Sequence, residues 1–196
     1  MNFVFDIGNV LVDFHPKIYL SKLFPNNPAL QDAMHKQVFE GPEWAAFDLG
    51  TLSHEQGTRN MISKCPANEN AIRETMARVH EMLSPILSTM ALLPVILDKG
   101  HRLFFLSNYQ RELYPFLFKT YPCFSLFEGG VFSCDVHQIK PDPAIYHTLM
   151  DNHGLRAEDC VFFDDLERNA RGAQAVGMEG VAFRDADDVR RVLDRF

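Results

Sequence analysis

Positive charge is sparse in this sequence and nowhere concentrated. No run of Lys or Arg is longer than two residues, and 26 acidic residues outnumber 19 basic ones, which gives a formal net charge of −7. Proteins that bind nucleic acids neutralise phosphates with a basic face, so this composition argues against a nucleic-acid partner. An anionic ligand should therefore be small and should meet positive charge that is gathered locally.

Cysteines are also few, and no two of them are spaced as CxxC. The four are Cys65, Cys123, Cys134 and Cys160. Because they lack the spacing of a zinc site or a redox pair, they fit reduced thiols, and we expect a cytoplasmic protein.

Long apolar runs and targeting signals are missing. The most apolar region, residues 86–97, is interrupted by Pro94 and by two hydroxyl-bearing residues, so it is too broken to span a membrane. Residues 1–5 enter a strand-like run directly, without the basic segment and apolar stretch of a signal peptide. We expect neither export nor a membrane partner.

What the sequence does contain is enough apolar material for a core. Hydrophobic residues make up 46% of the 196, and many of the 17 Phe residues fall in strand-like runs such as LFFL at 103–106. Residues 14–84 show helix-period apolar positions and no clear strand, whereas from residue 102 onward short apolar strands alternate with helical stretches. The pattern predicts an α/β fold, a parallel sheet flanked by helices and interrupted by a helical insert.

The boundaries follow from the same pattern. The α/β part should comprise residues 1–13 and 85–196 and the insert residues 14–84, with short hinges near 13–16 and 83–86. The expected strands are 102–107, 130–134, 160–164 and 180–183, and the expected helices are 109–120, 142–153 and 168–177.

Three positions carry helix-end signals. Ser53 with Gln56 predicts a capping box inside the insert. Asp142 with Pro143 predicts the start of a helix, and Gly154 predicts its end.

Four short segments place reactive residues where apolar strands end. They are FDIGN at 5–9, LSN at 106–108, IKPD at 139–142 and FFDD at 162–165. In open parallel sheets ligands bind beyond the carboxyl ends of the strands, so segments far apart in sequence converge there. Together they supply a carboxylate that can attack, a hydroxyl and an ammonium that can hold phosphate oxygens, and two carboxylates that can bind a metal.

With these motifs in this order, the chain resembles the haloacid dehalogenase-like hydrolases over essentially its whole length. The branch it resembles has a Rossmann-like core with a small helical cap inserted soon after the first motif, here residues 14–84. The DIGNVLVD run and the DD pair with downstream Asn169 are most similar to the sugar-phosphate phosphatases of that branch, such as the alpha-glucose-1-phosphate phosphatases.

Asp6 is the predicted nucleophile. A carboxylate here can attack phosphorus and form an aspartyl-phosphate, which water then hydrolyses. Taken alone, FDIGN also fits an ordinary Asp at a strand end, in a turn with Gly8 and Asn9. The other three motifs favour the catalytic interpretation.

Asp6 and Asp165 are the predicted side-chain ligands of Mg²⁺, which prefers oxygen donors. The resemblance implies that the backbone carbonyl of Gly8 is the third ligand and that Asp164 lies in the outer shell or binds through water. Without metal the three acids should repel one another and raise their pKa values. The alternative is a DD pair that only caps the following helix.

Ser107, Asn108 and Lys140 are the predicted phosphate-binding residues. The Ser107 hydroxyl and the backbone N–H of Asn108, at the start of the next helix, would donate to phosphate oxygens. Lys140 would stabilise negative charge that develops on the phosphoryl group and restrain Asp6. Asn169 replaces an acid often found in the family and would orient Lys140 or a metal-bound water. A helix-capping Ser–Asn pair and a solvated loop lysine are the alternatives.

Gly8 is the main departure from the family pattern, in which most phosphatases carry a second Asp two residues after the nucleophile. That Asp protonates the leaving oxygen and later activates water, and losing such a group typically removes about two to four orders of magnitude of rate. Two hypotheses follow. The leaving group needs little protonation, as the anomeric oxygen of a sugar 1-phosphate does, or a cap residue or water donates the proton.

The cap is the expected source of specificity, because closing it over the crevice would exclude water. Candidate residues are Trp44, Phe47, Asp48 and His54. A Trp and a Phe at helical spacing are more often core residues, and a His inside a capping box is more often exposed.

The sequence thus predicts a magnesium-dependent phosphatase of small phosphorylated metabolites, with sugar phosphates such as hexose 1-phosphate expected, acting as a monomer or weak dimer. The enzyme alternative is a haloacid dehalogenase, which also uses an Asp nucleophile but needs no metal. The retained Asp164 and Asp165 argue against it. The alternative from another class is a non-catalytic binding protein on the same fold.

Overall fold

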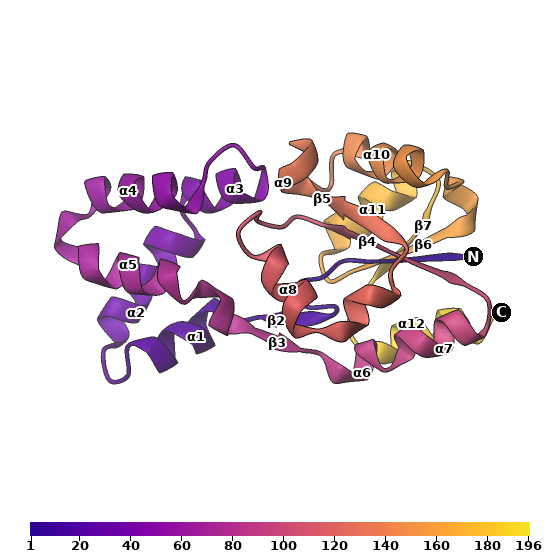
Figure 1. Ribbon diagram of the computed structural model, residues 1–196, viewed down its shortest axis with the longest axis horizontal. Helices are drawn as coiled ribbons and strands as arrows, with labels where there is room; N and C mark the ends of the chain where they lie inside the picture. The colour runs from indigo at the N-terminus through magenta and orange to yellow at the C-terminus, as the bar shows by residue number, and fades with distance from the viewer.

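A five-stranded parallel sheet in the order β5-β4-β1-β6-β7 forms the centre of the computed structural model, which describes residues 1–196. The strands are β1 (Asn2–Phe5), β4 (Arg102–Ser107), β5 (Gly129–Phe132), β6 (Cys160–Asp164) and β7 (Glu179–Ala182). The three central strands β1, β4 and β6 read as continuous apolar runs because they are covered on both faces. Figure 1 shows the sheet between two layers of helices.

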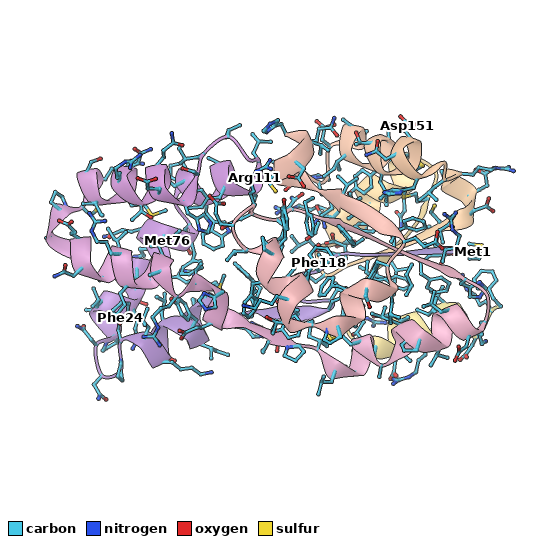
Figure 2. All side chains as sticks on the ribbon, viewed as in Figure 1. Met1, Phe24, Met76, Arg111, Phe118 and Asp151 are labelled. Carbon is cyan, nitrogen blue, oxygen red and sulfur yellow. The ribbon has the colours of Figure 1, made fainter.

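Helices of the α/β part cover the two faces. They are α6 (Leu87–Met90), α7 (Leu92–Asp98), α8 (Tyr114–Thr120), α9 (Ser133–Val136), α10 (Pro143–His153), α11 (Glu167–Ala175) and α12 (Ala186–Leu193). Successive strand residues point to opposite faces. Phe3 and Phe5 therefore pack with apolar residues of α7 and α12, whereas Val4 packs with those of α10 and α11. Figure 2 shows side chains filling the space on both sides of the sheet.

The segment between β2 (Val12–Phe14) and β3 (Leu83–Pro85) is helical, and these two short strands pair antiparallel. Its helices are α1 (Pro16–Leu23), α2 (Pro28–Met34), α3 (Pro42–Asp48), α4 (His54–Lys64) and α5 (Glu69–Ala77), with a π-helical turn at His35–Phe39. Figure 1 shows these helices gathered at one end of the molecule, away from the sheet. We propose that residues 14–84 act as a cap whose hinge is the β2–β3 pair.

Short 3₁₀ turns complete the chain and lie at Pro66–Asn68, Val79–Met82, Pro122–Leu126 and Ala157–Asp159. None of the helices combines the length and the apolar character that crossing a membrane requires.

The predicted fold class is confirmed, and so are the helix-end signals. Ser53 and Gln56 form a complete capping box. The Asp142 side chain accepts a hydrogen bond from the backbone N–H of Ala144, and Gly154 ends the helix with a left-handed φ of 60°.

Two predicted boundaries were wrong. The helix expected over 109–120 begins only at Tyr114, because the Tyr109 N–H donates instead to the Ser133 hydroxyl at 2.9 Å and Pro115 favours a helix start at its own position. The strand expected over 130–134 ends at Phe132, where the chain turns into α9.

Candidate active site

The carboxyl ends of β1, β4 and β6 bring the predicted residues together. Asp6 follows β1 directly, Ser107 ends β4, and Asp164 ends β6. Because β1 pairs with both β4 and β6, these three residues are neighbours across the sheet edge. Lys140 reaches the same point from the loop between α9 and α10, where it is 2% exposed.

Asp6 has one carboxylate oxygen held by three donors and one that is free. Its Oδ1 accepts hydrogen bonds from the Ile7 N–H at 2.7 Å and the Ser107 hydroxyl at 2.7 Å, and lies 2.8 Å from Lys140 Nζ. No hydrogen bond reaches Oδ2. The side chain is therefore fixed in orientation while one oxygen keeps its lone pairs available.

Lys140 uses all three of its ammonium hydrogens on protein acceptors. Besides Asp6, Nζ donates to Asp164 Oδ2 at 2.6 Å and to the Leu106 carbonyl at 2.9 Å. Burial opposes the charged ammonium, but the two carboxylates outweigh burial and raise the pKa of Lys140 above its ordinary value. Lys140 therefore keeps its positive charge in the interior, and each of its three N–H groups has an acceptor in the protein.

Asp164 is fully buried and accepts a hydrogen bond from the Lys140 ammonium. Besides the ammonium, its oxygens accept from Asn169 Nδ2 at 3.0 and 3.1 Å and from the Leu166 N–H at 2.9 Å. Asn169 therefore contacts Asp164 and reaches Lys140 only through it, not directly as the sequence suggested. The Asn169 Oδ1 atom is buried and has no partner.

Asp165 points toward the open side of this cluster and is partly exposed. Its Oδ2 accepts a hydrogen bond from Asn9 Nδ2 at 2.9 Å, and Asn9 Oδ1 accepts from the Phe14 N–H at 2.9 Å. Asn9 was not predicted as a site residue. The signal was its place after Gly8 in a turn, since Asn tolerates the left-handed φ of 55° found here.

The donor set fits a divalent cation. Carboxylate oxygens of Asp6, Asp164 and Asp165 lie within 4.8 Å of one another, and hard oxygen ligands are what Mg²⁺ prefers. The carbonyl of Gly8 accepts no hydrogen bond from the protein, so it also has a lone pair to offer.

Asp6 and Asp165 have raised pKa values, so their charged forms are disfavoured in this site. A bound cation would favour the charged forms. The pKa of Asp6 is raised to about 7, chiefly by burial and also by repulsion from Asp164, while Lys140 opposes the rise. Burial likewise raises the pKa of Asp165, and Asp164 contributes again. Repulsion among the acids was expected to raise these pKa values, but burial is the larger cause.

The Asn108 backbone N–H was predicted to donate to phosphate at the start of a helix, but no helix starts at Asn108. Residues 108–113 form a loop, so no helix dipole lies behind the Asn108 N–H. The Asn108 side chain instead clamps the backbone of Lys140, accepting from its N–H at 2.8 Å and donating to its carbonyl at 3.2 Å. Asn108 thereby fixes the loop that carries the lysine.

A cavity of about 330 Å³ opens over Asp6 between the sheet edge and the helical segment. It is lined by Asp6, Gly8, Asn9, Phe14, Trp44, Asp48, Leu83, Ser107, Asn108, Tyr109, Gln110, Leu113, Lys140, Asp165, Leu166, Arg168 and Asn169. Arg168 is exposed there and forms no ion pair, and the sequence had given no reason to select it.

The four cap candidates divide into two pairs. Trp44 and Asp48 line the cavity. Phe47 is 1% exposed and packs in the core, and His54 lies behind Gln110, whose Oε1 is 2.7 Å from His54 Nε2.

Two proteins of known activity that are similar to this chain are hydrolases. The flavin mononucleotide hydrolase 1 of the Arabidopsis thaliana chloroplast is 24% identical, over 94% of this chain and 75% of that protein. A sesquiterpene phosphatase of Aspergillus oryzae is 23% identical, over 93% of this chain and 89% of that protein.

Solved structures share the fold. An enzyme from Bacteroides thetaiotaomicron, solved in complex with magnesium and inorganic phosphate, superposes with a TM-score of 0.74 at 21% identity, over 94% of each chain. The model of the haloacid dehalogenase-like hydrolases matches residues 1–177. That match covers four of the five strands of the sheet and the whole helical segment, so the chain belongs to the haloacid dehalogenase-like hydrolase family.

Proposed function

We propose that this protein is a magnesium-dependent phosphatase that hydrolyses small phosphorylated metabolites through an aspartyl-phosphate on Asp6. The observation that carries the proposal is the state of Asp6, which lines the cavity and whose Oδ1 is held by three donors while Oδ2 has none. A nucleophile that must attack in line needs this combination of fixed orientation and a free lone pair.

Each residue of the cluster has a part in this reaction. Asp6 attacks phosphorus, and Ser107 and Lys140 keep its carboxylate oriented. Lys140 also places a buried positive charge beside the point where the phosphoryl group must sit, which stabilises negative charge in a site with little water. Asn108 and Asp164 hold Lys140 by its backbone and its ammonium, respectively.

Asp6, Asp165 and the carbonyl of Gly8 would hold Mg²⁺, which when bound supplies charge neutralisation for the phosphate dianion. Asp6, Asp164 and Asp165 carry three negative charges against the one positive charge of Lys140. The surplus of two matches one divalent cation. Magnesium and phosphate in the Bacteroides enzyme of the same fold support this part of the proposal.

We further propose that the substrates are sugar phosphates, with hexose 1-phosphates favoured. The cavity of about 330 Å³ is of the size that suits a small metabolite. Its apolar side includes Phe14 and Trp44, whose ring centroids lie 5.7 Å apart and which offer a surface for a sugar ring. An anomeric leaving oxygen also asks for less protonation than a primary alkoxide.

A haloacid dehalogenase remains the enzyme rival, and the acids argue against it. A halide pocket gains nothing from Asp165, a carboxylate beside the nucleophile that is oriented by Asn9 and bound to no cationic side chain.

Phosphate release from a panel of phosphorylated metabolites, with and without Mg²⁺, tests the proposal. We expect turnover that EDTA abolishes and that Asp6→Asn lacks. Matched measurements on hexose 1-phosphates and 6-phosphates test the finer part, which a clear preference for 6-phosphates would contradict. Release of halide from 2-haloacids without metal would replace the phosphatase proposal by its rival.

A further inference from the structure

The core of the site contains no acid that could protonate a leaving group. Gly8 stands where such an acid would be, and a Cβ built on it meets no atom within 4 Å, so the space beside it is open. Three acidic residues line the cavity, namely Asp6, Asp48 and Asp165. The proposed function uses Asp6 as nucleophile and Asp165 as metal ligand, which leaves Asp48.

Asp48 comes from the helical segment rather than from the sheet. It is the last residue of α3, and Figure 1 shows this end of α3 reaching across to α9. The reacting phosphorus would sit on Asp6, at the sheet edge. In-line displacement puts the leaving oxygen on the side of phosphorus opposite Asp6, which is the side that faces the helical segment.

Specific contacts keep the end of α3 in this place. The Ser133 hydroxyl donates to the Asp48 carbonyl, and His137 Nδ1 lies 2.9 Å from the carbonyl of Leu49. Gly50 has a φ of 71°, and a Cβ there would lie 2.2 Å from the carbonyl oxygen of Cys134, so only glycine permits this approach. These backbone contacts hold the end of α3, and with it Asp48, in place.

The surroundings of the Asp48 carboxyl bring its pKa close to neutral pH. Its pKa is raised to about 7, chiefly by burial and also by the charge of Asp6, while Gln110 and Lys140 oppose the rise. No cationic side chain forms an ion pair with Asp48. The carboxyl can therefore both give and take a proton near pH 7.

Gln110 is the neighbour that orients this group. It is 2% exposed, its Oε1 faces His54 Nε2 at 2.7 Å, and its Nε2 has no hydrogen-bond partner within ordinary geometry. That buried amide is available to donate to the Asp48 carboxyl, and Gln110 opposes the rise in the pKa of Asp48. Glu112 Oε2 lies 3.8 Å from the same His54 Nε2 atom.

We propose that Asp48 is the catalytic acid and base of this enzyme, in place of the side chain that Gly8 lacks. The inference rests on the proposed phosphatase function. In the first step Asp6 forms a bond to phosphorus, the P–O bond to the leaving group breaks, and the Asp48 carboxyl gives its proton to the departing oxygen. In the second step Asp48, now a carboxylate, takes a proton from the water that attacks the aspartyl-phosphate, and phosphate leaves with Asp6 and Asp48 restored.

The test compares leaving groups. Asp48→Asn keeps the size of the side chain and removes the proton, and Asp32→Asn, an exposed acid of α2, is the matched control. We expect Asp48→Asn to lower kcat on an alkyl phosphate roughly 100- to 10,000-fold. On p-nitrophenyl phosphate, whose leaving group departs without a proton, the loss in the first step should nearly vanish under single-turnover conditions. The control should match the wild type on both.

A double variant tests the role of Asp48 through recovery of activity and not only through its loss. Gly8→Asp places a carboxyl in open space, so Gly8→Asp combined with Asp48→Asn should recover part of the alkyl phosphate activity. In the wild type, the pH profile of kcat/KM should contain a limb that reports the ionisation of Asp48. This limb should be absent in Asp48→Asn.

Equal single-turnover losses on both substrates, with an unchanged pH profile, would overturn the role of Asp48 while leaving the phosphatase function intact. Failure of the wild type to cleave either substrate would instead overturn the proposed function, and the inference with it.

Discussion

The Ser107 hydroxyl donates to the same Asp6 oxygen that lies 2.8 Å from Lys140 Nζ. Ser107 and Lys140 thereby lock the rotation of the carboxylate about its own axis, and Oδ2 is left without a donor. Ser107 ends strand β4 and Lys140 lies in the loop between α9 and α10, so the lock exists only when β1, β4 and the Lys140 loop have assembled.

Ser107→Ala should therefore reduce turnover without unfolding the protein. Loss of one hydrogen bond to a charged group costs about 1.5–3 kcal/mol, which corresponds to roughly a 10- to 100-fold fall in kcat/KM. Steady-state kinetics on the best substrate of the panel measure it. Ser125→Ala, which removes an exposed hydroxyl far from the site, is the control, and a fall of the same size in both variants would contradict the assignment.

Lys140→Met should destabilise the fold as well as abolish activity. It leaves the carboxylates of Asp6 and Asp164 buried without their cation, and breaking a buried pair in this way costs about 3–5 kcal/mol. Urea unfolding measures the free energy. Adding Asp164→Asn removes one of the unpaired charges, so the double variant should regain stability but not activity. Recovery of activity would show that the lysine only balances charge.

Stability should depend on pH through Asp48. Its folded pKa of about 7 lies above the ordinary value of 3.8, so its favourable contribution is complete below about pH 4 and is lost as pH rises through 7. Asp48→Asn cannot ionise. Thermal unfolding should therefore show the variant gaining on the wild type between pH 5 and pH 8, and a constant difference across that range would contradict the raised pKa.

Gly180→Ala should destabilise the edge of the sheet where Gly8→Ala does not. A Cβ at Gly180 would lie 1.9 Å from the backbone carbonyl oxygen of Ala170, which a side-chain movement cannot relieve, whereas the one at Gly8 meets nothing. Overpacking of this kind costs about 1–3 kcal/mol, measurable by urea unfolding. Equal stability of the two variants would mean that α11 moves freely away from β7.

The convergence of the acids could be predicted because parallel strands end at a common edge. Apolar runs before Asp6, Ser107 and Asp164 identify three strand ends, and the pairing of β1 with both neighbours does the rest. Helix α12 as a whole was not predicted, although Asp185 caps its start by accepting a hydrogen bond from the Asp187 N–H, a signal that the sequence contains.

Other features depend on contacts between distant residues and could not be predicted. Residues 108–113 form a loop and not a helix because the Tyr109 N–H donates to the Ser133 hydroxyl. No local sequence pattern predicts this hydrogen bond. The same holds for Asp48, whose place over Asp6 depends on how the end of α3 meets α9. Sequence reasoning proposed Asp48 among four cap residues but had no means of separating it from Phe47, its buried neighbour.

The central claim is that Asp6 and Asp165 together bind the divalent cation on which hydrolysis depends. Calorimetric titration of the protein with Mg²⁺, repeated on Asp165→Asn, tests it most directly, because removing one of two carboxylate ligands leaves the Lys140 cluster intact. We predict saturable binding of one Mg²⁺ per chain in the wild type and its loss, together with phosphatase activity, in the variant. Absence of binding in the wild type, or equal affinity in both proteins, would contradict the account.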